Sequence, residues 1–157
     1  MSLTWSPERL CQEIVEHSAI AIIVSDREGR VRLWNQGAEV LFGWNAAETL
    51  GLSMDIIVPE KHRARHWDGY NKVMETGTTK YGRDVLAVPA LTKDGRRISI
   101  EFNVALLMNA DGGVVGAAAT IQDVSARWER DKALRARLAE LEAKVKQLAA
   151  PDGPAKE

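Results

Sequence analysis

The chain has 157 residues, enough for one domain of ordinary size and a short appendage. Hydrophobic residues make up 45% of it and charged residues 27%, a composition that excludes general disorder. Its 21 basic and 22 acidic residues nearly cancel, so we expect no nucleic-acid partner. The single cysteine, Cys11, excludes an internal disulfide and a cysteine-rich metal site.

The N-terminal segment and the apolar runs of the chain predict a cytoplasmic protein. No charged stretch followed by an apolar run marks a secretion signal. The longest apolar stretch, residues 19–24, is too short to cross a bilayer, so we expect no membrane partner. The sequence also lacks a nucleophile elbow, a phosphate-binding glycine loop and a zinc-protease helix motif. We therefore do not expect an enzyme.

The first expected element is a helix over residues 7–17. Ser6 is a good N-cap, and Pro7 suits the first helical position. The apolar residues of this helix fall on one face, which predicts packing against a sheet: Leu10, Cys11, Ile14 and Val15. Two β-branched runs follow at residues 20–24 and 31–34. An Asp…Gly turn separates them, which predicts an antiparallel hairpin.

The middle of the chain predicts helices. Asn35 can cap a helix over residues 36–42. Asn45 and Glu48 have the spacing of a capping box at the start of another. A longer helix is expected from Pro59 to about residue 75. One face of this helix carries a stripe of residues spaced four, four and three apart: His62, His66, Tyr70 and Val73.

Three strands are expected at residues 85–88, 97–104 and 114–123. In the second strand, apolar and polar residues alternate over eight positions, so one face should cover the core and the other should face water. The order of elements predicts an α+β domain with helices on one face of a five-stranded antiparallel sheet. We assign residues 1–18 to an N-terminal helix and residues 19–124 to this domain.

A last helix is expected over residues 125–150, which contain no glycine or proline. Five of its apolar residues form a seam with heptad spacing: Leu134, Leu138, Leu141, Val145 and Leu148. A stripe this narrow predicts a two-stranded coiled coil and therefore a homodimer, to which the N-terminal helix should add contacts. Docking of the helix on its own domain is the alternative. Residues 151–157 are expected to form a disordered tail.

The histidines on the long helix are the candidates for a binding site. Because His66 shares its stripe with apolar residues, its ring should point into the domain. It is then either a hydrogen-bonded core histidine or an axial ligand to haem iron, which requires a neutral imidazole in an apolar pocket. His62 and His66 lie one turn apart and could together hold another metal ion. That site would need a third ligand, and His17 is the only other histidine.

Four segments resemble the PAS domain family. They read WNQGAEVLFGW at residues 34–44, ETLG at 48–51, KDG at 93–95 and QDV at 122–124. The resemblance spans about residues 8–126. It implies the five-stranded PAS sheet, a ligand pocket between the sheet and the long helix, and a signalling helix after the last strand.

Residues 58–66, VPEKHRARH, resemble the haem-binding branch of the oxygen-sensing PAS proteins. That branch carries the proximal histidine on this helix after a similar stretch, which implies His66 as the iron ligand. His62 is the competing ligand if the helix is rotated. The sequence departs from the branch at Leu86, which stands where those sensors place an arginine, and at Tyr70, an aromatic one position later than theirs. The cysteine motif of the light-sensing flavin branch is absent.

The resemblance implies a pocket for haem b. Opposite His66 we expect an apolar wall without a hydrogen-bond donor, formed by residues 117–119 with Ala118 at their centre and by Leu86, Ile100 and Phe102. The second ring nitrogen of His66 should donate to the carbonyl of His62. Three arginines are candidates to pair with the haem propionates: Arg63, Arg65 and Arg83.

We therefore expect a sensory PAS module for signal transduction that binds haem b and responds to a diatomic gas or to redox state. The signal should pass through the dimeric C-terminal helix to a downstream partner, or to a further domain if the chain is a fragment of a longer sensor. The alternative is a PAS dimerisation or interaction module whose pocket is empty or holds another small ligand.

Overall fold

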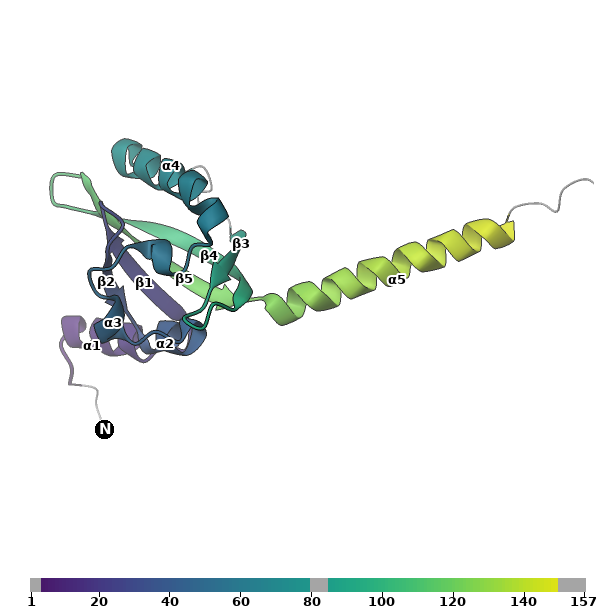
Figure 1. Ribbon diagram of the computed structural model, residues 1–157. Coiled ribbons are helices and arrows are strands. Elements are labelled where there is room, and N and C mark those ends of the chain that lie inside the picture. Colours follow the sequence, from purple (N-terminus) through teal and green to yellow (C-terminus); the bar gives the residue numbers. More distant parts are fainter. Residues whose placement is uncertain (1–3, 80–84, 150–157) are drawn as a thin grey trace, which may run out of the picture. The chain divides into compact units, whose positions relative to one another are not determined.

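The computed structural model describes residues 4–79 and 85–149. The described chain divides after Val124 into two compact units. The first contains a five-stranded antiparallel sheet with the strand order β2-β1-β5-β4-β3 (Figure 1). The strands are β1 (Ala21–Asp26), β2 (Val31–Trp34), β3 (Leu86–Leu91), β4 (Arg97–Met108) and β5 (Val114–Asp123). The predicted hairpin, the five-stranded antiparallel sheet and the α+β class are confirmed.

Helices precede the sheet, connect β2 to β3, and form the second unit. The helices are α1 (Pro7–Glu16), α2 (Gln36–Phe42), α3 (Ala46–Thr49), the short 3₁₀ turn η1 (Met54–Ile56), α4 (Glu60–Thr76) and α5 (Ser125–Ala149). Their ends follow the predicted signals. Asn35 caps α2, Asn45 and Glu48 form a capping box on α3, and left-handed Gly43 and Gly77 end α2 and α4.

The core lies on the face of the sheet that α2, η1 and α4 cover. Strand alternation directs Ile23, Ile98 and Ile100 to this face, where they pack in one cluster with Phe42 of α2. Toward the other end of the sheet, Met74 of α4 packs on β5. Helix α2 therefore packs on one end of this face of the sheet, and α4 packs on the other.

Asn35 ties three segments together through one buried side chain. Its Oδ1 accepts hydrogen bonds from the backbone N–H groups of Ile22 (2.8 Å) and Ala38 (2.9 Å). Its Nδ2 donates to the carbonyl of Val15 at 2.8 Å and to that of Ile20 at 2.9 Å. The end of α1, the start of β1 and the first turn of α2 thus depend on the same amide group.

Two sequence predictions about the first unit are wrong. The sheet does not cover the apolar face of α1: Leu10 is 40% exposed and Ile14 is 60% exposed. Amphipathic spacing shows that a helix has a face to cover, but not what covers it. Strand β3 was predicted to end at Val88, yet it runs through Pro89 to Leu91. It tolerates this proline because it is an edge strand.

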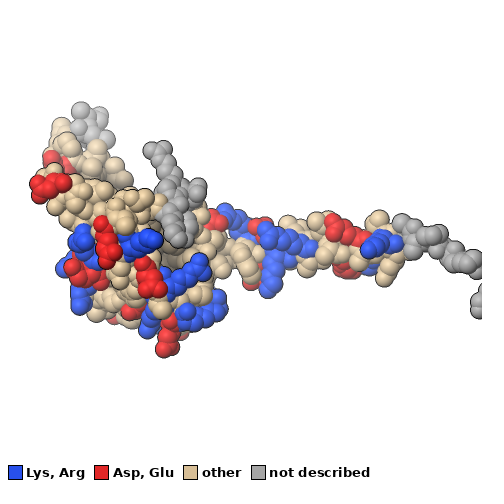
Figure 2. Space-filling model, turned by 90° about the horizontal axis from the view of Figure 1, so that it is seen from above, with Lys and Arg blue, Asp and Glu red and all other residues tan. Residues whose placement is uncertain are grey.

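The second unit contains α5, whose seam is exposed at all five predicted positions. On its surface, Glu140 pairs with Arg137 at 2.8 Å and with Lys144 at 2.6 Å. Basic and acidic side chains are interspersed along α5 and over the face of the first unit seen in Figure 2. No helix in the described ranges is both long enough and apolar enough to cross a membrane.

Candidate ligand-binding site

A cavity of about 540 Å³ lies between the covered face of the sheet and α4. Its walls come from β1, β3, β4 and β5 and from the helical segments within residues 54–74. Most of the lining side chains are apolar. Small-molecule and cofactor sites typically occupy about 300–1,000 Å³ and have this character. The cavity is therefore large enough for a ligand of cofactor size.

The wall contributed by α4 consists of the predicted stripe: His62, His66, Tyr70 and Val73 all line the cavity. Spacings of three and four residues place side chains one above another on the same side of a helix. Two of these four residues place imidazole rings in the lining of a cavity that is mainly apolar.

The His66 imidazole lines the cavity from the middle of α4. Its Nδ1 is buried and has no hydrogen-bond partner among the described residues. The predicted bond to the His62 carbonyl is therefore wrong, because helical carbonyls point along the axis while the His66 ring points into the cavity. The ring lies edge-on to Trp67 at 4.9 Å and stacks with Tyr70 at 6.0 Å between centroids. Burial lowers the pKa of His66, which the Asp55 carboxylate partly opposes.

Because its pKa is lowered, His66 is neutral at pH 7 and makes stability depend on pH. As the pH falls below the ordinary value of about 6.5, the unfolded chain binds a proton at His66 that the folded chain resists. We expect the free energy of unfolding to fall between pH 7.5 and 5.5, and to fall less in the His66→Gln variant. Denaturant titrations at several pH values measure this, with exposed His17→Gln as the control. An identical pH profile in the parent and His66→Gln would contradict the assignment.

The other predicted basic residues occupy different positions. His62 lines the cavity, and its Nε2 is also buried without a partner in the described part of the chain. Arg65 lines the cavity as well. Arg63 does not: it donates to the carbonyls of Val58 (3.2 Å) and Asp55 (3.1 Å), so its predicted role toward a propionate is wrong. Arg83 lies outside the described residues.

Tyr70 connects α4 to the first strand at one end of the cavity. Its hydroxyl donates to the carbonyl of Asp26 and lies 2.9 Å from Oγ of Ser25, which also lines the cavity. Burial raises the pKa of the Tyr70 hydroxyl, which therefore stays protonated and able to donate. Ser25 was not among the predicted site residues, although the alternation of Ala21, Ile23 and Ser25 along β1 places it on the cavity face.

The wall opposite α4 is apolar. Leu86, Ile100 and Phe102 line the cavity as the sequence analysis placed them, and Leu86 pairs with Phe102 across β3 and β4. Ala118 does not line it. Side chains alternate along β5, so Ala117 and Ala119 face the cavity while Ala118 belongs to the opposite face of the sheet.

Trp67 anchors the middle of α4 to the rest of the domain. Its Nε1 donates to Oδ1 of Asp55 at 2.8 Å. Its ring lies against Gly29, where an added Cβ would come within 2.2 Å of the ring and where φ is +71°. Only glycine fits this turn without moving Trp67. The cavity therefore lies beneath a helix that is fixed both at Trp67 and at Tyr70.

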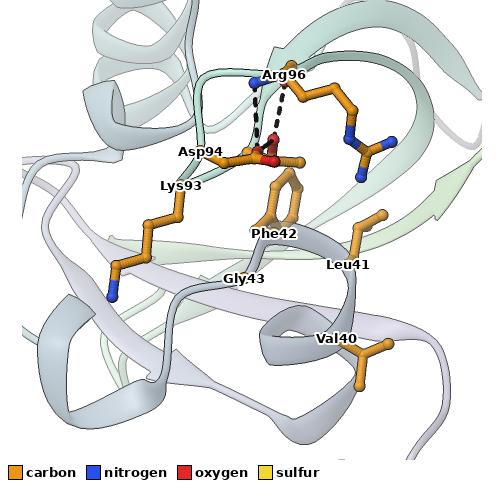
Figure 3. A pocket seen from close by; sticks show the side chains of 8 residues that line it. Val40, Leu41, Phe42, Gly43, Lys93, Asp94 and Arg96 are labelled. Atoms are coloured by element: carbon orange, nitrogen blue, oxygen red, sulfur yellow. Dashed lines mark hydrogen bonds between the residues drawn. The ribbon is translucent and has the colours of Figure 1, made fainter.

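A second depression, of about 360 Å³, lies between α2 and the turn from β3 to β4 (Figure 3). Three of its four polar side chains, those of Thr92, Lys93 and Asp94, already have partners. The Asp94 carboxylate accepts from the hydroxyl of Thr92 and from the backbone N–H of Arg96, and Lys93 pairs with Glu48. These contacts fix a tight turn. The cavity under α4, with its unpartnered histidine nitrogens, is the better candidate for a ligand site.

A metal site built from protein side chains alone has no support in the described residues. No group of three or more His, Cys, Asp or Glu side chains there is arranged to hold an ion. His17 lies near Gln36 Oε1 (3.3 Å) and Glu13 (3.2 Å), and it does not line the cavity with His62 and His66. An ion at His66 would need its remaining ligands from a bound group.

Comparison with known proteins assigns the family. FixL, a sensor protein from Bradyrhizobium diazoefficiens, is 44% identical over 50 residues, which are 32% of this chain and 10% of FixL. AtoS, a signal transduction histidine-protein kinase from Escherichia coli, is 30% identical over 121 residues, 76% of this chain and 18% of AtoS. The chain spans less than a fifth of the length of the curated relatives it matches.

Solved structures agree with the fold. The PAS domain of a protein from Colwellia psychrerythraea superposes with a TM-score of 0.68 at 20% identity, over 77% of this chain and 99% of that one. This likeness concerns the fold alone. The sequence profile described as the PAS fold matches residues 9–124, which include the whole sheet and the cavity. The chain therefore belongs to the PAS family.

Proposed function

We propose that this PAS domain is a sensory module for signal transduction whose cavity binds haem b through His66. The observation that carries the proposal is a neutral imidazole in an apolar cavity, with a buried Nδ1 that has no partner among the described residues. Residues 58–66 support it through their resemblance to the haem-binding branch of PAS proteins. When bound, haem supplies an iron centre that changes redox state and binds diatomic gases.

The chain's own residues would select among signals. His66 would hold the iron from α4, and Trp67 and Tyr70 fix the position of that helix. The wall of Leu86, Ile100 and Phe102 is apolar and offers no hydrogen-bond donor. Bound oxygen carries partial negative charge and is stabilised by a hydrogen-bond donor, whereas bound carbon monoxide is stabilised little. We therefore expect a response to carbon monoxide, nitric oxide or redox state in preference to oxygen.

Strand β5 offers a route from the cavity to the output helix. Ala117, Ala119 and Ile121 of β5 line the cavity, and Val124 alone separates this strand from α5. The backbone N–H of Val124 donates to the carbonyl of Ser99 at 2.8 Å, which fixes the exit. We propose that the signal continues through α5 as the dimerising helix of a homodimer, to a partner or a further domain.

The proposal is tested by titrating the full chain with haem and following the Soret band. We expect one equivalent to bind, and His66→Ala to abolish stoichiometric uptake because the iron loses its protein ligand. His17→Ala removes an exposed histidine elsewhere and should bind as the parent does. Circular dichroism checks that each variant is folded. Absence of haem uptake by the parent, or an unchanged spectrum in folded His66→Ala, would overturn the proposal.

A ligand-free interaction module is the second candidate function. The observation that favours it is the exposed apolar surface on α1 and along the α5 seam, which a second chain could cover. A dimer that takes up no haem after its addition would support this alternative.

A further inference from the structure

The cavity lining carries one permanent charge and no carboxylate among its described residues. The charge belongs to Arg65, whose side chain is exposed and therefore marks a place where the cavity meets solvent. No ion pair with another residue of 4–79 or 85–149 neutralises it. A guanidinium beside an apolar cavity favours a ligand that brings an anion to the same place, because charge-assisted hydrogen bonds are the strong ones.

His62 provides a second hydrogen-bonding group next to Arg65. It lies three residues earlier on α4, the spacing at which side chains are neighbours on a helix surface. Its buried Nε2 has no partner in the described part of the chain, and a buried polar nitrogen costs stability until it is paired. His66 lies one helical turn after His62 and also places its imidazole in the cavity lining. Polar and cationic groups thus lie together on α4, facing an apolar wall.

The other arginine of this helix turn is not available to a ligand. The Arg63 guanidinium donates hydrogen bonds to the carbonyls of Val58 and Asp55, and it lies 3.7 Å from the Asp55 carboxylate. Arg65 therefore lines the cavity and is open to a ligand, whereas Arg63, two residues earlier, is bonded to its own chain.

We infer that Arg65 and His62 bind a carboxylate of the ligand, so that the cavity accepts molecules with an apolar body and a terminal carboxylate. The propionates of haem have this chemistry, as does a fatty acid. In the haem case the inference rests on the proposed function and adds the second point of attachment. In the fatty-acid case it stands without iron.

Two pairs of probes test the carboxylate on the full chain. The first is protoporphyrin IX, which lacks iron, against its dimethyl ester; the second is oleate against methyl oleate. In at least one of the two pairs, we expect the acid to bind more tightly than its ester. Arg65→Gln should weaken the acid about tenfold or more and leave the ester unchanged, because a charge-assisted bond is lost. His62→Leu should weaken the acid by a smaller factor.

Lys61→Gln is the matched control, since it removes the same charge from the same helix at a residue that does not line the cavity. It should bind every probe as the parent does. Selective binding of the porphyrin acid that depends on Arg65 supports the inference even if His66→Ala leaves haem binding unchanged. In that case the proposed function fails while the carboxylate site stands, so the two are tested separately. Selective oleate binding alone supports it with a fatty acid as the ligand. Loss of acid and ester binding to the same extent in Arg65→Gln, or no preference for either acid, overturns it.

Discussion

Replacing Leu138 and Leu141 with aspartate is expected to convert a dimer of this chain into a monomer at micromolar concentration. All five seam residues are exposed, and Leu148 reaches 87%. Burial of each large apolar side chain stabilises a dimer by roughly 1.5–3 kcal/mol. Two buried carboxylates in each chain should therefore raise the dissociation constant by more than about a hundredfold, by both lost burial and repulsion. Light scattering and sedimentation equilibrium measure the change.

Ala136 and Ala143 provide the matched control for this pair. They lie seven residues apart on α5 and outside the seam, so the Ala136→Asp, Ala143→Asp double variant adds the same charge without entering the interface. It should remain dimeric. A monomeric parent would remove both the coiled coil and the route through α5. A seam variant that stays dimeric would place the interface elsewhere, with the exposed face of α1 as the next candidate.

Gly116→Ala is expected to destabilise the domain by at least about 3 kcal/mol, the upper range for overpacking. An added Cβ would lie 2.3 Å from the carbonyl oxygen of Ser25, and backbone atoms of a paired strand cannot swing aside. Strands β1 and β5 would have to separate locally, beside the cavity wall. The midpoint of denaturant unfolding reports the change.

Gly69→Ala is the control for the same chemical change in an open place. Apart from its chain neighbours and the backbone of its own helix, no atom of the described residues lies within 4 Å of an added Cβ at Gly69, which stands inside α4. Alanine there should stabilise the chain by roughly 0.5–1 kcal/mol, through helix propensity. Equal effects of the two substitutions would contradict the packing that we describe at Gly116.

Local signals in the sequence predicted the helix ends and the stripe on α4. Asn35, Asn45 and Gly43 act through their own backbone neighbours, so a short stretch of sequence is enough to read them. The same holds for His62, His66 and Tyr70, because helical spacing alone places them on one face. The position of Ile100 and Phe102 followed from the alternation of apolar residues along their strand, and that of Leu86 followed from the resemblance to the haem-binding branch.

Other features depend on contacts between distant segments. Three consecutive alanines at 117–119 give no polar residue from which to read the alternation, and only the pairing of Ala119 with Ile23 and with Val104 fixes it. The separation of Arg63 from Arg65 depends on Asp55, in a different element. The residue opposite Trp67 is Gly29, which its sequence context indicates only as a turn residue.

The amide of Asn35 has a consequence for hydrogen exchange. Its single oxygen accepts from the N–H groups of Ile22 and Ala38, which belong to a strand and to a helix. Rotation of this one side chain would release both protons together, and it would also free the carbonyls of Val15 and Ile20. Amides on separate elements would then exchange in a shared opening event, with the same dependence on denaturant. The start of the sheet and the base of α1 would behave as one cooperative unit.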